Sequence, residues 1–338
     1  MSSDGIQRRK KTSNKNRDNT EVLSPETTAP EVVPQRNEQK SIVKRVFTRM
    51  ALSVAILSMV YFTTKTNSKT ELVMASVSET ISGSPKGQEV ICSKSYNEER
   101  LKFTSCAPQR CGRFVSDAVV SQKEAIHLLS LAKRGLSLGG SSGGASILDL
   151  HSGALSQNTS FVNIYKLIES KQKQNIFEEK DFEVYKSVKN KILETIAIYF
   201  GISSKHLYLT HPTFFSRITT KTAKTVDDEY WQKHIDKHNY RSFVFTSLLY
   251  LSTFNEDFSG GRFVFIDNNI NKTIAIEPKL GRLSAFTSGS ENPHFVEKVT
   301  KGTRYAITVS FTCDPKYSIK DPSLTNNSNQ KLLKGYRI

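Results

Sequence analysis

The pattern of apolar and polar positions changes near residue 201. Before it, apolar residues recur at helical spacing in two stretches, which predict helices over residues 121–138 and 179–200. Gly201 follows the second stretch, where a helix commonly ends in a left-handed residue. After it, short runs rich in β-branched and aromatic residues alternate with turn residues, which is typical of strands. These strands are predicted at residues 207–210, 214–219, 231–236, 243–252, 262–266, 272–277, 282–287, 294–299 and 304–312.

Strands of this length and spacing are typical of a sandwich or a jelly roll. Helices that precede such a unit in the chain can cover its outer sheet, so we expect one α+β domain with a jelly-roll core braced by N-terminal helices. The predicted divisions are an N-terminal helical part at residues 89–206, a β core at residues 207–314 and a C-terminal tail at residues 315–338.

The first 64 residues have a different character. Residues 1–49 are polar and charged, which predicts a disordered cytosolic tail. Residues 50–64 are mostly apolar and would span about 22 Å as a helix, less than the ~30 Å hydrocarbon core of a bilayer and near the length of a signal-peptide core. The long leader and the terminal cations Arg49 and Lys65, which can snorkel, favour an uncleaved transmembrane signal anchor. A buried core helix is the alternative.

The charges around this apolar segment predict its orientation. Lys44, Arg45 and Arg49 crowd its N-terminal flank, so the positive-inside bias predicts a single-pass type II membrane protein. The C-terminal bulk then lies in the lumen of the secretory pathway, in the ER or the Golgi. The Ser/Thr-rich residues 65–88 are interpreted as a lumenal stalk.

The cysteines and glycosylation motifs agree with a lumenal location, because all of them follow the apolar segment. An even number of cysteines in an oxidising compartment allows two disulfides in three pairings, and the spacing leaves the pairing open. Asn271 is the favoured glycosylation site, because its surroundings resemble an exposed turn. The cysteines are Cys92, Cys106, Cys111 and Cys313, and the motifs begin at Asn158, Asn271 and Asn326.

The composition permits a sizeable core and adds a strong positive charge. Hydrophobic residues make up 37% of the chain, and the net charge is +16 with an isoelectric point near 9.6. Such a charge would suit nucleic acid or an anionic membrane surface. However, no Lys/Arg run is interleaved with aromatic residues, and neither zinc-finger nor basic-zipper spacing occurs. We therefore expect no nucleic-acid partner.

The candidate chemistry lies in the predicted β core. His234 and Asp236 are two residues apart, so on a strand both side chains point to one face and can bind one metal ion. His294, at the start of another predicted strand, is the candidate third ligand. Two histidines and a carboxylate form the facial triad of non-haem Fe(II) oxygenases. Arg304, on the following strand, can hold a carboxylate in bidentate fashion.

Several segments of this region, in their order along the chain, resemble the prolyl 4-hydroxylase type of 2-oxoglutarate/Fe(II) dioxygenase. The similarity covers about residues 207–314 and is weaker in the preceding helices. Collagen-type members usually carry Lys where this chain has Arg304, and often Tyr where it has Trp231. The segments are His234-Ile-Asp236, Ser247-Leu-Leu-Tyr-Leu-Ser252, Gly260-Gly-Arg-Phe-Val-Phe265, Ile276-Glu-Pro-Lys-Leu-Gly281, His294 and Lys301-Gly-Thr-Arg-Tyr-Ala306.

The resemblance implies a double-stranded β-helix with iron on His234, Asp236 and His294, 2-oxoglutarate on Arg304, and L-ascorbate as a reductant. It implies an enzyme that uses O2 to hydroxylate a polypeptide side chain while 2-oxoglutarate becomes succinate and CO2. A catalytically inactive, membrane-tethered metal-binding module is the alternative, and the presence of Arg304 argues against it. A zinc site on His234 and His238 would require a helix, whereas the segment is predicted as a strand.

Overall fold

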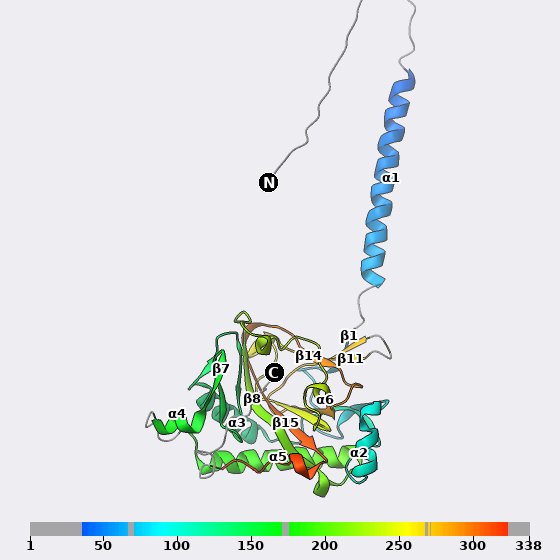
Figure 1. Ribbon diagram of the computed structural model, residues 1–338. Helices are drawn as coiled ribbons and strands as arrows, with labels where there is room; N and C mark the ends of the chain where they lie inside the picture. The colour runs from blue at the N-terminus through cyan, green and yellow to red at the C-terminus, as the bar shows by residue number, and fades with distance from the viewer. Residues whose placement is uncertain (1–35, 67–70, 171–175, 268–269, 271, 324–338) are drawn as a thin grey trace, which may run out of the picture. The chain divides into compact units, whose positions relative to one another are not determined.

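The computed structural model describes residues 36–66, 71–170, 176–267, 270 and 272–323. The chain divides into two units, residues 1–68 and residues 69–338. The described part of the first unit is the helix α1, Arg36–Thr66 (Figure 1). This helix contains neither proline nor glycine and begins shortly after Pro34, which favours an uninterrupted helix.

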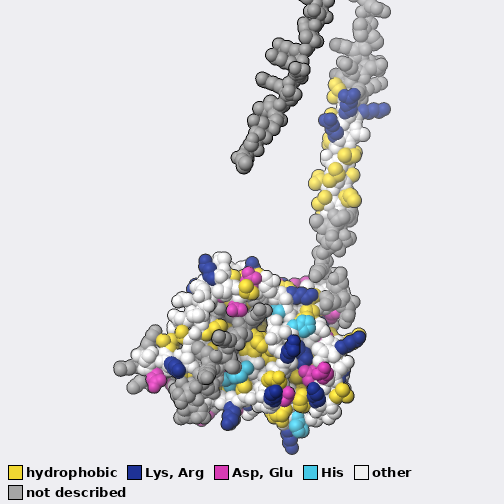
Figure 2. All heavy atoms as spheres, viewed as in Figure 1, with side chains coloured by type: hydrophobic (Ala, Val, Ile, Leu, Met, Phe, Trp, Pro, Cys, Tyr) yellow, Lys and Arg dark blue, Asp and Glu magenta, His cyan; other side chains and the backbone are white. Residues whose placement is uncertain are grey.

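The helix α1 differs from the sequence prediction at its N-terminal end. Residues 36–49 are helical, whereas the sequence predicts disorder there; residues 1–35 lie outside the described residues. Side chains from Ile42 to Tyr61 are exposed, with Lys44, Arg45 and Arg49 near one end and apolar side chains beyond them (Figure 2). Among the described residues, no helix combines the length and the apolar character that crossing a membrane requires.

The second unit contains the remaining described helices and the strands (Figure 1). The helices are α2 (Asn97–Lys102), α3 (Gln122–Leu136), α4 (Ile164–Ser170), α5 (Glu179–Phe200) and α6 (Asp236–Asn239). The strands before α5 are β1 (Glu71–Ala75), β2 (Lys86–Val90), β3 (Cys111–Ser116), β4 (Gly140–Ser141), β5 (Ala145–Leu148), β6 (Ala154–Asn158) and β7 (Ser160–Asn163). The later strands are β8 (Tyr208–Thr219), β9 (Phe245–Tyr250), β10 (Phe258–Gly260), β11 (Phe263–Asp267), β12 (Lys272–Ile276), β13 (Leu283–Thr287), β14 (His294–Val296) and β15 (Val299–Thr312).

The two long helices of this unit confirm their sequence predictions. Ser121 and Glu124 form a capping box that satisfies main-chain donors at the start of α3. Helix α5 ends at Gly201, whose φ of 69° lies in the left-handed region that glycine adopts without a steric penalty. Apolar side chains at helical spacing on both helices are buried.

Two sheets face each other in a jelly-roll-like core. The major sheet has the strand order β2-β3-β13-β9-β15-β8-β5-β6-β4. In addition, β10 pairs with β15 and β7 pairs with β6. The minor sheet has the order β1-β12-β11-β14. Neighbouring strands are antiparallel except for the pairs β1–β12 and β4–β6. This arrangement confirms the predicted jelly-roll core with helices.

Alternation along the central strand β9 separates two apolar layers. Leu248 and Tyr250 lie between the two sheets, together with side chains of β11, β12 and β13. Phe245 and Leu249 point to the opposite face and pack in a cluster with the buried side of α3 and α5. The period of two that defines a strand thus places the helices on the outer face of the major sheet.

The strand predictions are partly right at their boundaries. The predicted strands at 207–210 and 214–219 form one strand, β8, and the predicted strand at 294–299 is divided between β14 and β15. The predicted strand at 231–236 is wrong. Only His234 forms a bridge there, with His294, and the chain then enters α6.

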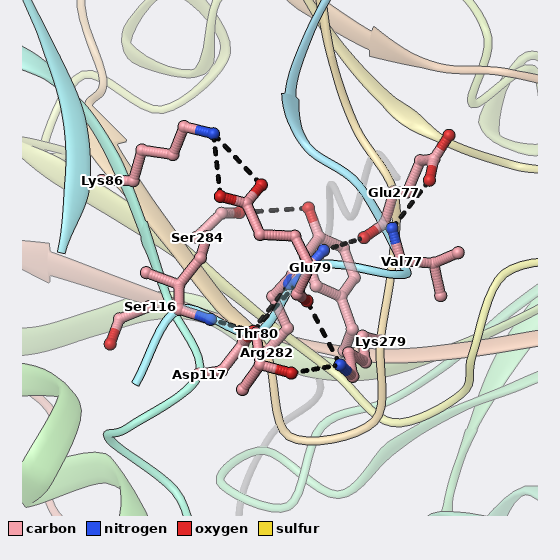
Figure 3. A network of polar contacts seen from close by, with 12 residues as sticks. Val77, Glu79, Thr80, Lys86, Ser116, Asp117, Glu277, Lys279, Arg282 and Ser284 are labelled. Atoms are coloured by element: carbon pink, nitrogen blue, oxygen red, sulfur yellow. Dashed lines mark hydrogen bonds and ion pairs between the residues drawn. The ribbon is translucent and has the colours of Figure 1, made fainter. Parts of the chain in front are cut away.

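The segment interpreted as a stalk belongs to the sheets instead. Strand β1 pairs with β12, and β2 pairs with β3, so both lie within the folded unit. The buried side chain of Arg282 fixes the connection between them by donating to the main-chain oxygens of Ser76 and Glu79 at 3.0 and 2.8 Å (Figure 3). It also pairs with Asp117 at 2.8 Å. The Ser/Thr-rich composition wrongly indicated a stalk, because the polar groups of this segment bond to residues of distant strands.

The cysteines form two disulfides, Cys92–Cys111 and Cys106–Cys313. The second joins the N-terminal part to the residue that follows β15. Residues beyond β15 continue along the core, where the main-chain N–H of Ile319 donates to the oxygen of Leu209 at 2.9 Å. Residues 324–338 of the predicted C-terminal tail lie outside the described residues.

Candidate functional site

Three side chains that the sequence singles out meet at one point. One ligand atom from each of His234, Asp236 and His294 lies within 4.8 Å of the others. The Nε2 atoms of both histidines lie 3.6 Å from Oδ1 of Asp236. Asp236 and His294 are buried, whereas the side chain of His234 is 24% exposed. The cluster is therefore accessible from the side of His234.

The main chain brings these three side chains together, although the strand predicted at residues 231–236 does not form. His234 and His294 exchange main-chain hydrogen bonds at 2.9 and 3.0 Å, which fixes the two residues against each other. Asp236 is the first residue of α6, and its side chain returns to the same point. The spacing of two residues thus brings the side chains together across the start of a helix and not on one face of a strand.

Hydrogen bonds fix the tautomer of both histidines. Nδ1 of His234 donates to the oxygen of Gln232, and Nδ1 of His294 donates to the oxygen of Asn292, each at 2.9 Å. A carbonyl oxygen can only accept, so the hydrogen is on Nδ1 and the lone pair of Nε2 faces Asp236. This second hydrogen bond is the usual device for orienting a metal-binding histidine.

The surroundings of His294 keep it neutral. Its ring centroid lies 4.9 Å from those of Phe263 and Phe286. Burial lowers the pKa of His294 to about 4, and this outweighs the opposing effect of Asp236. A neutral imidazole is the form that binds a metal ion.

The residues present fit a divalent iron ion. Oδ2 of Asp236 is buried and has no hydrogen-bond partner among the described residues. A buried carboxylate oxygen without a partner is unfavourable, and a cation would satisfy it. Two imidazole nitrogens and one carboxylate are the donor set of the 2-His-1-carboxylate triad, which leaves coordination positions open.

A cavity of about 70 Å³ adjoins the triad and contains the predicted cosubstrate residue. Arg304 is 1% exposed, and its Nε donates to the oxygen of Gly261 at 2.9 Å. Its Nη2 is buried and has no partner in the described part of the chain. The cavity is lined by Pro212, Phe214, Ser216, Ile218, Tyr230, His234, Asp236, Asn239, Tyr240, Phe243, Thr246, Leu248, Phe263, His294, Val296, Arg304 and Thr308.

Arg304 differs from Arg113 and Arg282, the other arginines that are fully buried among the described residues. Arg113 and Arg282 place their guanidinium groups against the carboxylates of Asp267 and Asp117. Arg304 faces the ring of Tyr250, at 5.5 Å from its centroid, and burial lowers its pKa. A buried guanidinium that retains an unused N–H in a cavity is suited to bind the carboxylate of a small molecule.

Other candidates lie outside the cluster. His238 is exposed on α6 and is not part of the ligand group, so the zinc interpretation is not supported. Trp231 does not line the cavity; Lys298 Nζ lies 4.0 Å from its ring centroid. Asn158 is exposed at the end of β6, whereas Asn271 and Asn326 lie outside the described residues. Sequence reasoning missed Asn292, although its position before Pro293 indicated a restricted main chain.

Comparison with known proteins matches residues 220–312 to the model of the 2OG-Fe(II) oxygenase superfamily. The mouse protein called 2-oxoglutarate and iron-dependent oxygenase domain-containing protein 3 is 57% identical over 237 residues, which cover 70% of this chain and 74% of that protein. The chain belongs to the 2-oxoglutarate and iron-dependent oxygenase family. Membership implies Fe(II) and 2-oxoglutarate as the cofactor and cosubstrate of the family, and the donors described above fit both.

Two further proteins resemble the chain over a shorter stretch or more distantly. Human prolyl 3-hydroxylase 2 is 47% identical over 74 residues, which are 22% of this chain and 10% of that protein. A solved prolyl hydroxylase of Trichoplax adhaerens, in complex with a peptide fragment of the hypoxia inducible factor oxygen degradation domain, is 18% identical with a TM-score of 0.40. That alignment covers 65% of this chain and 90% of the solved chain.

Proposed function

We propose that this chain is an active dioxygenase that hydroxylates a polypeptide side chain while 2-oxoglutarate is converted to succinate and CO2. The observation that carries the proposal is the Nη2 of Arg304, which has no hydrogen-bond partner among the described residues and shares one cavity with His234, Asp236 and His294. A protein that only binds metal has no use for this buried cation. The cation costs free energy unless an anion pairs with it.

The residues have separate roles in this proposal. His234, Asp236 and His294 hold iron, which when bound supplies the redox and O2 chemistry that side chains lack. Arg304 binds the carboxylate of 2-oxoglutarate that is remote from the metal, and so sets the direction of the cosubstrate in the cavity. Aromatic and aliphatic side chains such as Phe263 and Val296 exclude water from the site. L-ascorbate is the proposed reductant.

The polypeptide substrate approaches from the side of His234 in this proposal. A hollow of about 380 Å³ adjoins the cavity there, and the two share His234 and Asn239. The exposed side chain of Val226 and the half-buried Ile235 give the hollow an apolar part that suits a side chain of the substrate.

Turnover can be tested before a substrate is known. The full chain, loaded with Fe(II), is incubated with 2-oxoglutarate, O2 and ascorbate, and succinate is measured against His294→Ala prepared in the same way. We expect succinate from the wild type alone. Proteins from cells that express either form are then compared for peptides that carry one additional oxygen. Iron binding by the wild type without succinate at any cosubstrate concentration would instead favour an inactive binding module.

We also propose that residues 50–64 anchor the chain in the membrane of the ER or Golgi, with residue 65 onwards in the lumen. The proposal is supported by the basic residues before this segment and by two disulfides after it, which persist in an oxidising compartment. Asn158 is exposed, so we expect it to carry a glycan in eukaryotic cells. A chain without endoglycosidase-sensitive mass at Asn158, Asn271 and Asn326 would contradict the lumenal location.

A further inference from the structure

The buried side chain of Arg113 lies close to the candidate metal site, with one residue between it and His294. Arg113 belongs to β3, which precedes the residues matched by the family model, and its side chain is 0% exposed. Its Nη2 pairs with Oδ2 of Asp267 at 2.6 Å. Its Nε donates to Oε1 of Gln88 at 3.0 Å, and its Nη1 donates to Oδ1 of Asn292 at 3.2 Å. The planar guanidinium thus joins β2, β11 and the loop before β14 in one fixed geometry.

The side chain of Asn292 is held on both of its polar atoms. Its oxygen accepts from Arg113, and its nitrogen donates to the main-chain oxygens of Gly112 and Thr287 at 3.2 and 2.9 Å and to the Thr287 hydroxyl at 3.1 Å. Asn292 is 1% exposed, so water does not compete for these bonds. Its amide therefore has a single orientation.

The main-chain oxygen of this same residue accepts the hydrogen bond from Nδ1 of His294. We propose that Arg113 is a positioning residue for the metal site, because through Asn292 it holds the carbonyl that orients the His294 ring. This inference rests on the proposed function, since it assumes that His294 binds the metal. The N-terminal strands then complete a site whose ligands all lie in the β core.

Arg282 provides a matched control within the same fold. It is equally buried and pairs with a carboxylate, Asp117, but its other side-chain partners are the main-chain oxygens of Ser76, Glu79 and Glu277. None of these partners contacts a triad histidine. We expect replacement of either arginine to weaken the fold, because each is buried and ion-paired. Stability alone therefore does not distinguish a positioning role from a structural one, whereas metal affinity does.

The experiment is a titration of the metal-free full chain with Co(II), whose visible spectrum reports both affinity and ligand geometry without turnover. Arg113→Lys keeps a charge opposite Asp267 and loses the fork that reaches Asn292. Replacement of a residue that orients a metal ligand typically lowers metal affinity by about 10–100-fold. We expect a loss of this size and an altered spectrum for Arg113→Lys, and a change below about twofold for Arg282→Lys.

Equal affinities and spectra for these two variants would overturn the positioning role. If Arg113→Lys does not fold, Thr287→Val takes its place. It removes one acceptor of the Asn292 amide with little change of shape, and we expect a several-fold loss of Co(II) affinity. An unchanged affinity in Thr287→Val would then overturn the inference. A wild type that binds no Co(II) would contradict the proposed function itself, which is a distinct result.

Discussion

The imidazole rings of His234 and His294 lie 4.3 Å apart between their centroids, although sixty residues separate them in the chain. The two residues exchange both main-chain hydrogen bonds of a single bridge, so their separation is set by the backbone. Each ring is then oriented by the carbonyl two residues before it. In the proposed function, a metal ion entering this site would meet side chains that are already placed, which would lower the entropic cost of binding.

Replacement of His234, Asp236 or His294 by Ala should reduce Fe(II) affinity by more than about a hundredfold and abolish succinate formation. A residue that binds the metal directly contributes more to its affinity than a residue that only orients such a ligand. Iron titration and succinate assays check both effects. His238→Ala is the control: this exposed histidine is close in sequence but is not part of the ligand group, so its Fe(II) affinity should stay unchanged. An equal loss in His238→Ala would favour a helical metal site.

Arg304→Ala should raise the apparent KM for 2-oxoglutarate by about two orders of magnitude or more. A guanidinium binds a carboxylate through charge-assisted hydrogen bonds worth about 1.5–3 kcal/mol each, and a factor of ten in affinity corresponds to about 1.4 kcal/mol. Arg304→Lys should lie between, because it keeps the charge but loses the planar fork. Fe(II) affinity should be unchanged in both variants. An unchanged KM in Arg304→Ala would show that a residue other than Arg304 binds the carboxylate of 2-oxoglutarate.

The two disulfides should differ in their contribution to stability. They close sequence separations of 19 residues, for Cys92–Cys111, and 207 residues, for Cys106–Cys313. Constraint of the unfolded chain predicts about 3 kcal/mol for the shorter loop and about 5 kcal/mol for the longer one. Urea unfolding of the two double Cys→Ser variants measures this difference. Equal free energies of unfolding, or the reverse order, would contradict it.

The free energy of unfolding of the metal-free chain should fall as pH decreases below about 6.5. Nδ1 of the buried His151 donates to the oxygen of Lys320 and its Nε2 accepts from Tyr185, each at 2.8 Å. Burial lowers the pKa of His151, so on acidification the unfolded chain takes up a proton before the folded one does. In His151→Gln the loss between about pH 7 and pH 5 should be smaller, and an equal loss in urea titrations would contradict this assignment.

The cluster of His234, Asp236 and His294 could be predicted from the sequence because the chemistry of these residue types is local. His234 and Asp236 are two residues apart, and few residue types other than these bind iron in this pattern. The reason given for their proximity was wrong, since Asp236 begins a helix. Either conformation brings both side chains to one side of the main chain. The prediction that they lie together therefore did not depend on the secondary structure of the segment.

The residues that the sequence did not reveal act through long-range contacts. The bonds of Arg113 to Asn292 and of Arg282 to the connection between β1 and β2 join positions more than 150 residues apart. No period or spacing marks such a pair in one sequence. The same is true of the pairing Cys106–Cys313, for which spacing allowed three arrangements. Sequence patterns show which face of an element is buried, but not which distant side chain it meets.

The most direct test of the proposed function is the addition of 2-oxoglutarate to the Fe(II)-loaded full chain in the absence of O2. If the triad holds iron and Arg304 directs the cosubstrate onto it, a visible charge-transfer band should appear with the wild type. The band should require far more 2-oxoglutarate with Arg304→Ala and should be absent with His294→Ala. A wild type that binds Fe(II) but shows no band at saturating 2-oxoglutarate would contradict the assignment of this cavity as the cosubstrate site.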